Sequence, residues 1–370
     1  MMSSNNYDIY FDCGFSKLRA GAFNKVNSSK IFYTESKFLI NHLNLDSEIQ
    51  KIITSLEKNT NEYVDDVNLM IDSPNLMSIG ISVSKKIDGP KLRKEDVHFL
   101  IQEAKQQILK HYNNKNIIHI IINTYKINDV EYDHLPKDIK CNFISMDVLF
   151  ICLPNEIVEY YKNFFSKLDI SINQITCSSY AKSINYKESL SSYKDVSFID
   201  FGFNKTSITS YINNKIVSIN ALPIGGNHIT KDISKILKID LAQAEDLKIN
   251  FTKNTLFLND KNFSLELLQK IIFARTEEIL EICAKSIKLN LINMDQYKMI
   301  LMGEGSKILD NQYKDKISFA NDIDFLEETT EDICHSGFKL GLGFNKQEVV
   351  IVPKKQIRQG FFEKLFHFYK

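Results

Sequence analysis

Two segments of the chain share a pattern of residue types that is suited to binding phosphate. Residues 10–17 read YFDCGFSK and residues 198–205 read FIDFGFNK, 188 positions further along the chain. Each has an apolar pair, Asp, any residue, Gly, Phe, a small polar residue and Lys, and each is followed by a second β-like run. One Asp-x-Gly between apolar runs is typical of a plain hairpin turn, because Gly supplies a positive φ and Asp bonds its own backbone. Two copies with so many shared features predict the same hairpin built twice.

Two such turns that face each other would form a clamp for one anionic ligand. Their backbone N–H groups would cradle phosphates, and the lysines and hydroxyls would add charge-assisted hydrogen bonds. Asp12 and Asp200 would hold Mg²⁺ through water. The pattern therefore predicts a nucleotide site, whose phosphate and Mg²⁺ residues are Asp12, Gly14, Ser16, Lys17, Asp200, Gly202, Asn204, Lys205 and Thr206.

A third segment, residues 222–248, adds a glycine pair followed by two expected helices. Gly225 and Gly226 precede a helical pattern over residues 230–237, and Asp240 is placed to cap a second helix. On that second helix Glu245 and Lys248 lie one turn apart on one face, where they would grip a ribose or a base. A solvated surface ion pair is the alternative, and the pattern taken alone favours it.

The fourth segment is an apolar run that ends in glycines. Residues 299–302 read as a buried strand, Gly303-Glu304-Gly305-Ser306 follows, and a helix is expected to start there. The segment lacks the spacing of a Rossmann or P-loop fingerprint. With the third segment it gives the predicted nucleoside-binding residues, which are Gly225, Gly226, Glu245, Lys248, Gly303, Gly305 and Ser306.

The composition bounds the elements that must position these residues. A length of 370 residues allows two or three domains, and 44% hydrophobic with 25% charged residues is ordinary for globular proteins. The 46 basic and 46 acidic residues cancel, so nucleic acid is disfavoured as a partner. We find no signal-like start and no apolar run near the roughly 18 residues that cross a bilayer. Six cysteines without a C-x-x-C spacing fit a cytoplasmic chain with reduced thiols.

The order of these segments resembles the actin-like ATPase superfamily, which includes actin, heat-shock chaperones and sugar kinases. Within it the chain is similar to FtsA, the bacterial cell-division family that links the FtsZ ring to the membrane. Residues 12–17 resemble that family's D-I-G-T-S-K, and residues 200–208 its D-x-G-G-G-T-T-S-I. Residues 223–233 resemble its P-x-G-G-x-x-x-T-x-D-I, and residues 271–279 its I-I-x-P-R-x-E-E-I. The likeness extends from residue 8 to residue 370.

The resemblance implies an α/β, two-lobed actin-like ATPase fold with an inserted small α/β subdomain and a C-terminal amphipathic helix. Strand-like runs and a helix between residues 67 and 147 agree with the insert. The expected divisions are residues 1–66 and 148–195 with part of 330–350 for lobe 1, 67–147 for the insert, 196–345 for lobe 2 with an outer subdomain at about 226–296, 346–353 for a linker and 354–370 for a membrane-targeting helix.

The last seventeen residues have an amphipathic pattern. Five apolar side chains fall at i, i+1, i+4, i+5 and i+8 and form one face. Residues 354–370 contain five basic residues and the single acid Glu363. Docking on the chain's own domain is the alternative, but the basic flank and the likeness to FtsA favour binding at a membrane interface. The predicted membrane residues are Phe361, Phe362, Leu365, Phe366, Tyr369 and Lys364.

The resemblance also implies cofactors, partners and a location. ATP with Mg²⁺ is the expected ligand. The expected partners are the FtsZ C-terminal tail, further copies of the chain in filaments, later division proteins and anionic lipid on the inner face of the cytoplasmic membrane at the division site. Arg275 and Lys285, on an expected helix from about 264 to 289, are the predicted partner-binding residues. Pairing of Arg275 with Glu278 inside the helix is the alternative.

The chain departs from the family pattern in both phosphate loops. Phe203 and Asn204 stand where two glycines are usual, Lys205 replaces a threonine, and Phe15 replaces a small hydroxyl residue. A side chain at positive φ is costly unless it is Asn or Asp, and the phenylalanines would narrow the cleft. We therefore expect nucleotide binding with weak or absent hydrolysis, and no catalytic residue is named. Two other functions stay open, which are a PilM-like pilus-assembly scaffold and a soluble small-molecule kinase that would need a carboxylate base.

Overall fold

The computed structural model describes residues 6–27, 30–36, 45–87, 91–251, 264–288, 297–309 and 323–343. The predicted linker and membrane helix lie outside these residues. A first sheet has the strand order β3-β2-β1-β4-β9. Strands β1, β4 and β9 run parallel to one another, whereas β1, β2 and β3 are antiparallel neighbours. The bounds are β1 (Tyr7–Cys13), β2 (Leu18–Asn24), β3 (Ile31–Glu35), β4 (Asp66–Ile71) and β9 (Ser171–Cys177).

A second sheet has the order β14-β13-β10-β11-β12-β5-β8-β6-β7. Its strands β10, β13 and β14 are parallel, and the others pair antiparallel. The bounds are β10 (Val196–Phe201), β11 (Thr206–Ile212), β12 (Lys215–Leu222), β13 (Lys298–Met302), β14 (Ile323–Phe325), β5 (Met77–Lys86), β6 (Lys115–Ile127), β7 (Val130–Tyr132) and β8 (Phe143–Pro154).

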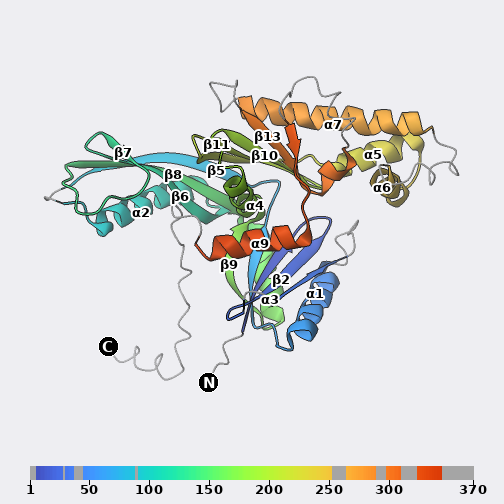
Figure 1. The fold of residues 1–370 in the computed structure, drawn as a ribbon, viewed down its shortest axis with the longest axis horizontal. Coiled ribbons are helices and arrows are strands. Elements are labelled where there is room, and N and C mark those ends of the chain that lie inside the picture. The colour runs from blue at the N-terminus through green and yellow to red at the C-terminus, as the bar shows by residue number, and fades with distance from the viewer. Residues whose placement is uncertain are drawn as a thin grey trace.

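Helices divide between the two sheets. We call the first sheet with α1 (Leu45–Thr60), α3 (Asn155–Lys167), α4 (Ser178–Ser189) and α9 (Thr330–Gly341) lobe 1. Lobe 2 consists of β10–β14 with α5 (Gly226–Leu237), α6 (Leu241–Asn250), α7 (Leu265–Lys288) and the short 3-10 helix η2 (Glu304–Ile308). Helix α2 (Lys94–His111) packs on β5 in the insert. In Figure 1, α2 and strands β6–β8 project to the left, and α7 lies along the top.

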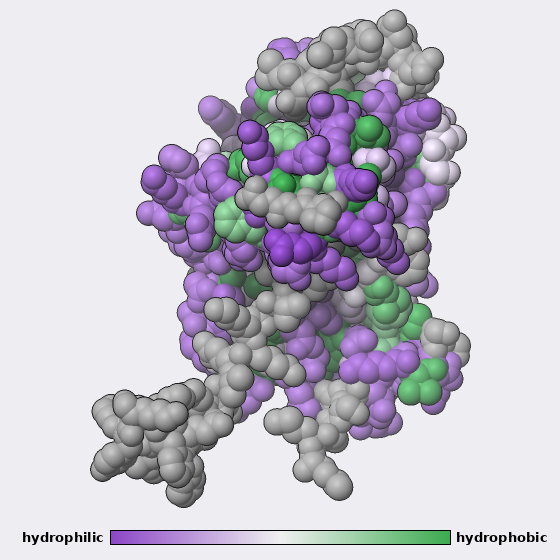
Figure 2. Space-filling model, turned by 90° about the vertical axis from the view of Figure 1, so that its left-hand side faces the viewer, coloured by the Kyte–Doolittle hydropathy of each residue, from purple (hydrophilic) through white to green (hydrophobic). Residues whose placement is uncertain are grey.

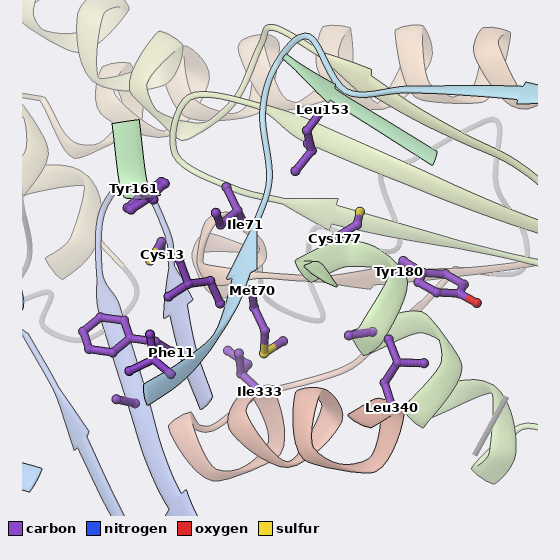
Figure 3. Packing of buried hydrophobic residues seen from close by; sticks show 14 of the residues in the cluster. Phe11, Cys13, Met70, Ile71, Leu153, Tyr161, Cys177, Tyr180, Ile333 and Leu340 are labelled. Atoms are coloured by element: carbon purple, nitrogen blue, oxygen red, sulfur yellow. The ribbon is translucent and has the colours of Figure 1, made fainter. Parts of the chain in front are cut away.

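The lobe 1 core explains why its strands read as continuous apolar runs. Helices α1 and α3, together with α4 and α9, pack against the sheet, so both faces of its central strands are buried. Figure 3 shows Phe11 of β1, Met70 of β4 and Ile333 of α9 in one packed cluster. Helix α9 approaches this sheet closely, because a Cβ at Gly337 would overlap Met70. This packing fixes the carboxyl ends of the three parallel strands.

The duplicated hairpin is confirmed. Strands β1 and β2 pair up to Cys13 and Leu18, and β10 and β11 pair in the same way up to Phe201 and Thr206. We expected glycine to supply a positive φ in these turns, and this expectation is wrong. Among the described residues, neither Gly14 nor Gly202 has a positive φ, and neither do Phe203 and Asn204. Both glycines are needed for close approach instead. A Cβ on Gly14 would lie 2.6 Å from the Lys17 carbonyl oxygen, and one on Gly202 would lie 2.9 Å from that of Lys205.

The insert lies between different residues from those predicted. Strand β4 was assigned to it, but β4 pairs with β1 and β9 in lobe 1. The strands that extend the second sheet begin at Met77 and continue to Pro154, beyond the expected end at 147. One residue pair, Asn220 with Met77, joins them to β12. The helix expected between residues 67 and 147 is confirmed as α2. Within the described ranges, the structure has no helix long and apolar enough to cross a membrane.

Candidate functional site

The carboxyl ends of parallel strands from both lobes meet at one cleft. Asp12 lies near the end of β1, Asp72 follows β4 and Ser178 follows β9, all in lobe 1. From lobe 2, Asp200 lies near the end of β10 and Glu304 follows β13. Ligand sites in open α/β sheets form at such strand ends. These residues line a cavity of about 70 Å³ between the lobes.

Arg19 connects the two lobes on one side of the cavity. This β2 residue donates from Nη1 to Asp12 Oδ2 at 3.2 Å and from Nη2 to Glu304 Oε1 at 2.7 Å. Ser178 Oγ donates to the other Asp12 oxygen at 2.7 Å. Burial alone would lower the pKa of Arg19, but the carboxylates of Asp12 and Glu304 outweigh it and raise the pKa. Arg19 therefore stays charged inside the protein and is fully committed to these two acids.

Lys182 of α4 forms the central contact of the cleft. Its Nζ lies 2.7 Å from Asp200 Oδ2 and 3.2 Å from Glu328 Oε2. Tyr186 Oη and the Gly303 backbone N–H also donate to Glu328, at 3.0 and 2.9 Å. Burial raises the pKa of Glu328. Burial would do the same to Asp200, but the attraction of Lys182 and other cations lowers the Asp200 pKa below its usual value. The lysine therefore keeps at least one carboxylate ionised in a buried site.

Lys205 makes a third contact between the lobes. Its Nζ lies 2.7 Å from Asp72 Oδ2. Asp72 also accepts from Ser179 Oγ at 2.8 Å and from Cys177 Sγ at 3.2 Å. The Cys177 backbone N–H in turn donates to Nε2 of His119, a buried residue of β6, at 2.9 Å. A chain of contacts thus runs from the insert to the second hairpin loop.

The charged side chains that line the cavity pair with one another. Each of its charged side chains has a partner of opposite charge within 3.2 Å. The five acids are Asp12, Asp72, Asp200, Glu304 and Glu328, and the four bases are Arg19, Lys182, Lys205 and Lys307.

The predicted phosphate residues divide into two groups. Those that line the cavity are Asp12, Gly14, Ser16, Asp200, Gly202 and Lys205, together with Phe15 and Phe203. Three others point elsewhere. Lys17 pairs with Glu35 at 3.0 Å, Asn204 accepts from Asn227, and Thr206 Oγ1 donates to the Ile224 carbonyl oxygen.

Glu245 and Lys248 form a buried pair, so the expected surface ion pair is wrong. Their carboxylate and ammonium lie 2.7 Å apart, with side chains 4% and 6% exposed. Lys248 also donates to the Gly226 carbonyl oxygen and to Thr230 Oγ1, at 3.0 and 2.8 Å. Burial lowers the pKa of Lys248 more than Glu245 raises it. The pair ties α6 to the first turn of α5 and does not line the cavity.

The glycines after β13 and before α5 permit contacts within the protein. Gly303 has φ +92°, and a Cβ there would lie 2.5 Å from Asp200 Oδ1. A Cβ on Gly305 would lie 2.7 Å from the Phe201 carbonyl oxygen, and one on Gly225 would lie 2.5 Å from that of Gly202. The helix expected to start at this segment is the short 3-10 helix η2, which ends at Ile308, and the backbone of Leu309 after it is extended. This part of the cleft is positioned by backbone packing.

Arg275 is held inside lobe 2. Its Nε and Nη2 donate to both oxygens of Asp232 on α5, at 2.5 and 3.1 Å, and Nη1 donates to Glu278 at 2.6 Å. The expected alternative, pairing with Glu278, is therefore present. Lys285 is exposed and lies 3.6 Å from Glu281.

Sequence reasoning missed most of the charged residues that fill the cleft. Arg19 carried a usable signal, since it is a lone cation in the apolar run LRAGAF, and Asp72 carried another as the residue after a buried strand. Lys182 and Glu328 had none, because nothing in their neighbouring residues marks them as buried.

The cleft holds no cluster that is typical of a metal site. Among the residues that the structure describes, no group of three or more His, Cys, Asp or Glu side chains is placed to hold a metal ion. Asp12 and Asp200, which were predicted to hold Mg²⁺ through water, each contact a basic side chain instead.

Two lobes with like-built hairpins and parallel strands that end at one cleft define a protein of the actin-like ATPase fold. A type IV pilus biogenesis PilM-PilN complex matches with a TM-score of 0.63 and 14% identity, over 88% of this chain and 89% of that one. The ethanolamine utilization protein EutJ from Carboxydothermus hydrogenoformans matches with 0.52 and 10% identity, over 91% and 90%. At such identities the likeness concerns the fold alone.

The family of cell division protein FtsA matches residues 197–281. Cell division protein FtsA of Buchnera aphidicola is 27% identical over 353 residues, which is 82% of each chain. That of Bacillus subtilis is 32% identical over 108 residues, or 25% of this chain and 24% of that one. The chain is an FtsA-like protein of the actin-like ATPase superfamily, and hence an actin-like cell-division protein.

Proposed function

We propose that the chain tethers FtsZ to the inner face of the cytoplasmic membrane and helps to assemble the division machinery. The observation that carries this proposal is the likeness to an FtsA chain over 82% of both lengths, since that alignment is far longer than the hairpins alone. The strands β5 to β8 with α2, which lie between β4 and β9, are a further support, because the resemblance to FtsA implies an inserted α/β subdomain in this part of the chain.

Two surfaces are available for protein partners. On α7, Lys270 and Lys285 are exposed basic groups that would meet an acidic peptide, and we assign the FtsZ tail to this face. The end of the molecule formed by the insert is mostly hydrophilic in Figure 2, with separate apolar side chains. Phe99 and Val130 are exposed there by 55% and 53%. We assign self-association and later division proteins to this end.

Membrane binding is proposed from the sequence of residues 354–370, which the described structure does not include. An aromatic face would enter the headgroup boundary, while the basic residues would meet anionic lipid at about 1 kcal/mol each. Removing residues 354–370 is expected to release the protein from anionic vesicles in a flotation assay. Phe366→Glu should have nearly the same effect, and added salt should weaken binding of the intact chain.

Thermal unfolding of the truncated chain is the control for this experiment. An unchanged transition with lost flotation supports the proposal. A lost transition would mean that the tail belongs to the core, and the membrane assignment would be wrong. Flotation without any other protein also separates this proposal from a PilM-like scaffold, whose fold the chain shares and which would reach the membrane through partners.

A soluble kinase of the same fold is a weaker proposal. It needs a carboxylate free to accept a proton from the substrate hydroxyl. All five carboxylates that line the cavity are already paired with bases.

The predicted ligand, ATP with Mg²⁺, does not fit the cleft as it is arranged. Sites for ligands of that size enclose about 300–1,000 Å³, whereas this cavity has about 70 Å³. Each base that would meet a phosphate already holds a carboxylate, and Asp12 and Asp200 each hold a base. The proposed function therefore includes no step that depends on the nucleotide.

A further inference from the structure

We infer that the chain's own ion pairs hold the two lobes together where a nucleotide was predicted to do so, and that lobe closure is independent of ATP. The inference concerns the cleft, and it stands or falls separately from the proposed tethering of FtsZ. It rests on three contacts that cross between the lobes. These are Arg19 with Glu304, Lys182 with Asp200 and Lys205 with Asp72, at 2.7 Å each.

The positions of these contacts follow from the duplicated fold. Two facing hairpins predict an anion bridged between them, with basic groups reaching in from both sides. Here Lys205, from the second hairpin, reaches instead across to Asp72 at the end of β4. Arg19, from the first hairpin, reaches to Glu304 after β13. A carboxylate of the opposite lobe thus occupies the place of an anionic ligand at both hairpins.

Burial makes these contacts stronger than surface ion pairs. The side chains of Arg19, Lys182 and Lys205 are 6–7% exposed. Of their cross-lobe partners, Asp72 and Asp200 are 8% and 10% exposed, and Glu304 is 30% exposed. Asp12 and Asp72 also accept hydroxyl hydrogen bonds, and Glu328 accepts from a tyrosine and a backbone N–H. Forming such pairs desolvates the charges, and the separated charges regain hydration when the lobes open. Opening would nevertheless break all three cross-lobe pairs together, along with the hydrogen bonds that position their carboxylates.

A nucleotide would have to break this network without replacing it fully. Its phosphates could pair with the four bases that line the cavity, but the five carboxylates would then face the phosphate anion. Phe15 and Phe203 line the same cavity, and their side chains add no hydrogen-bond donor. We therefore expect closure in the absence of any nucleotide and no measurable gain from adding one.

The first experiment measures binding through stability. The full chain is unfolded thermally with and without millimolar ATP and Mg²⁺, and GTP with Mg²⁺ serves as a second probe. A ligand that binds only the folded state raises the transition temperature in proportion to the logarithm of its concentration above Kd. We expect no shift. A dose-dependent rise with either nucleotide would overturn the inference.

The second experiment measures closure directly. The six native cysteines are buried, so spin labels can be directed to Lys162→Cys on α3 and Lys285→Cys on α7, both exposed positions. We expect one narrow distance distribution that ATP with Mg²⁺ does not change. A broad distribution that narrows on addition of the nucleotide would show that ATP closes the lobes, contrary to the inference.

Variants link the closed state to the ion pairs. Lys205→Met with Glu304→Gln removes two of the three cross-lobe contacts, and the distance distribution should become longer and broader. The matched control is Lys270→Met with Glu266→Gln, which removes an exposed pair on α7 and should leave the distance distribution between the lobes unchanged. If the cleft variant does not fold, Glu304→Gln alone, at a residue 30% exposed, provides the same readout. A distribution identical to that of the control would overturn the assignment.

Discussion

Replacing Lys182 by Met is the most direct test of the energetics of the cleft. The substitution keeps a long apolar stem and removes the ammonium that lies 2.7 Å from Asp200 and 3.2 Å from Glu328. The two carboxylates are 10% and 3% exposed, so the cleft can supply only a few water molecules in place of the lost ammonium. Breaking a buried ion pair by removing one member costs about 3–5 kcal/mol. That corresponds to a fall in the transition temperature of roughly 6–20 °C for a domain of this size.

The loss should depend on pH with a definite sign. Glu328 already has a raised pKa because of burial, and removal of Lys182 takes away the charge that opposes the rise. A carboxyl group whose pKa is raised on folding favours the folded state when protonated, and this contribution is lost as pH rises through the folded pKa. The difference in stability between wild type and Lys182→Met should therefore be larger at pH 8 than at pH 5.

The measurement is thermal and urea unfolding at both pH values, monitored by circular dichroism. Lys162→Met is the matched control, since that lysine pairs with Glu159 on the surface and should cost no more than about 0.5 kcal/mol. Lys182→Met together with Glu328→Gln should recover part of the loss. If Lys182→Met were as stable as Lys162→Met, the cleft would be more hydrated than the packing indicates and the reasoning would fail.

Two further predictions concern lobe 2. Gly303→Ala should lower the free energy of unfolding by about 1–3 kcal/mol, because φ is +92° there and the new Cβ would lie 2.5 Å from Asp200 Oδ1. Gly80 has open space around it, so Gly80→Ala should change the transition temperature little. Equal effects of the two substitutions would contradict the strain argument. Arg275→Glu should weaken binding of an FtsZ tail peptide at least about fivefold, or roughly 1 kcal/mol, in a fluorescence titration. Arg275→Lys is the control for the lost contact with Asp232. If Arg275→Glu binds the peptide as tightly as wild type, Arg275 has only a structural role.

Local patterns were sufficient for the elements that carry the site. The apolar runs around Asp12 and Asp200 identified both hairpins, and the capping residue Asp240 identified the start of α6, where it accepts a hydrogen bond from the Gln243 N–H. These features depend on residues within a few positions of one another. The insert was identified by its strands and helix, but its first boundary was misplaced because β4 is equally apolar whichever sheet it joins.

The sequence by itself determined the two hairpins and the start of α6, because hydrophobic period, glycine placement and caps are local properties. The fold class followed from the resemblance of the ordered segments to the actin-like ATPases. Only the tertiary structure decided which charges meet in the cleft. Arg19 and Glu304 are 285 positions apart and Lys182 and Glu328 are 146 apart, and no local pattern encodes such partners. Whether a lysine binds a phosphate or a carboxylate of its own chain depends on which group the fold brings within about 3 Å of it.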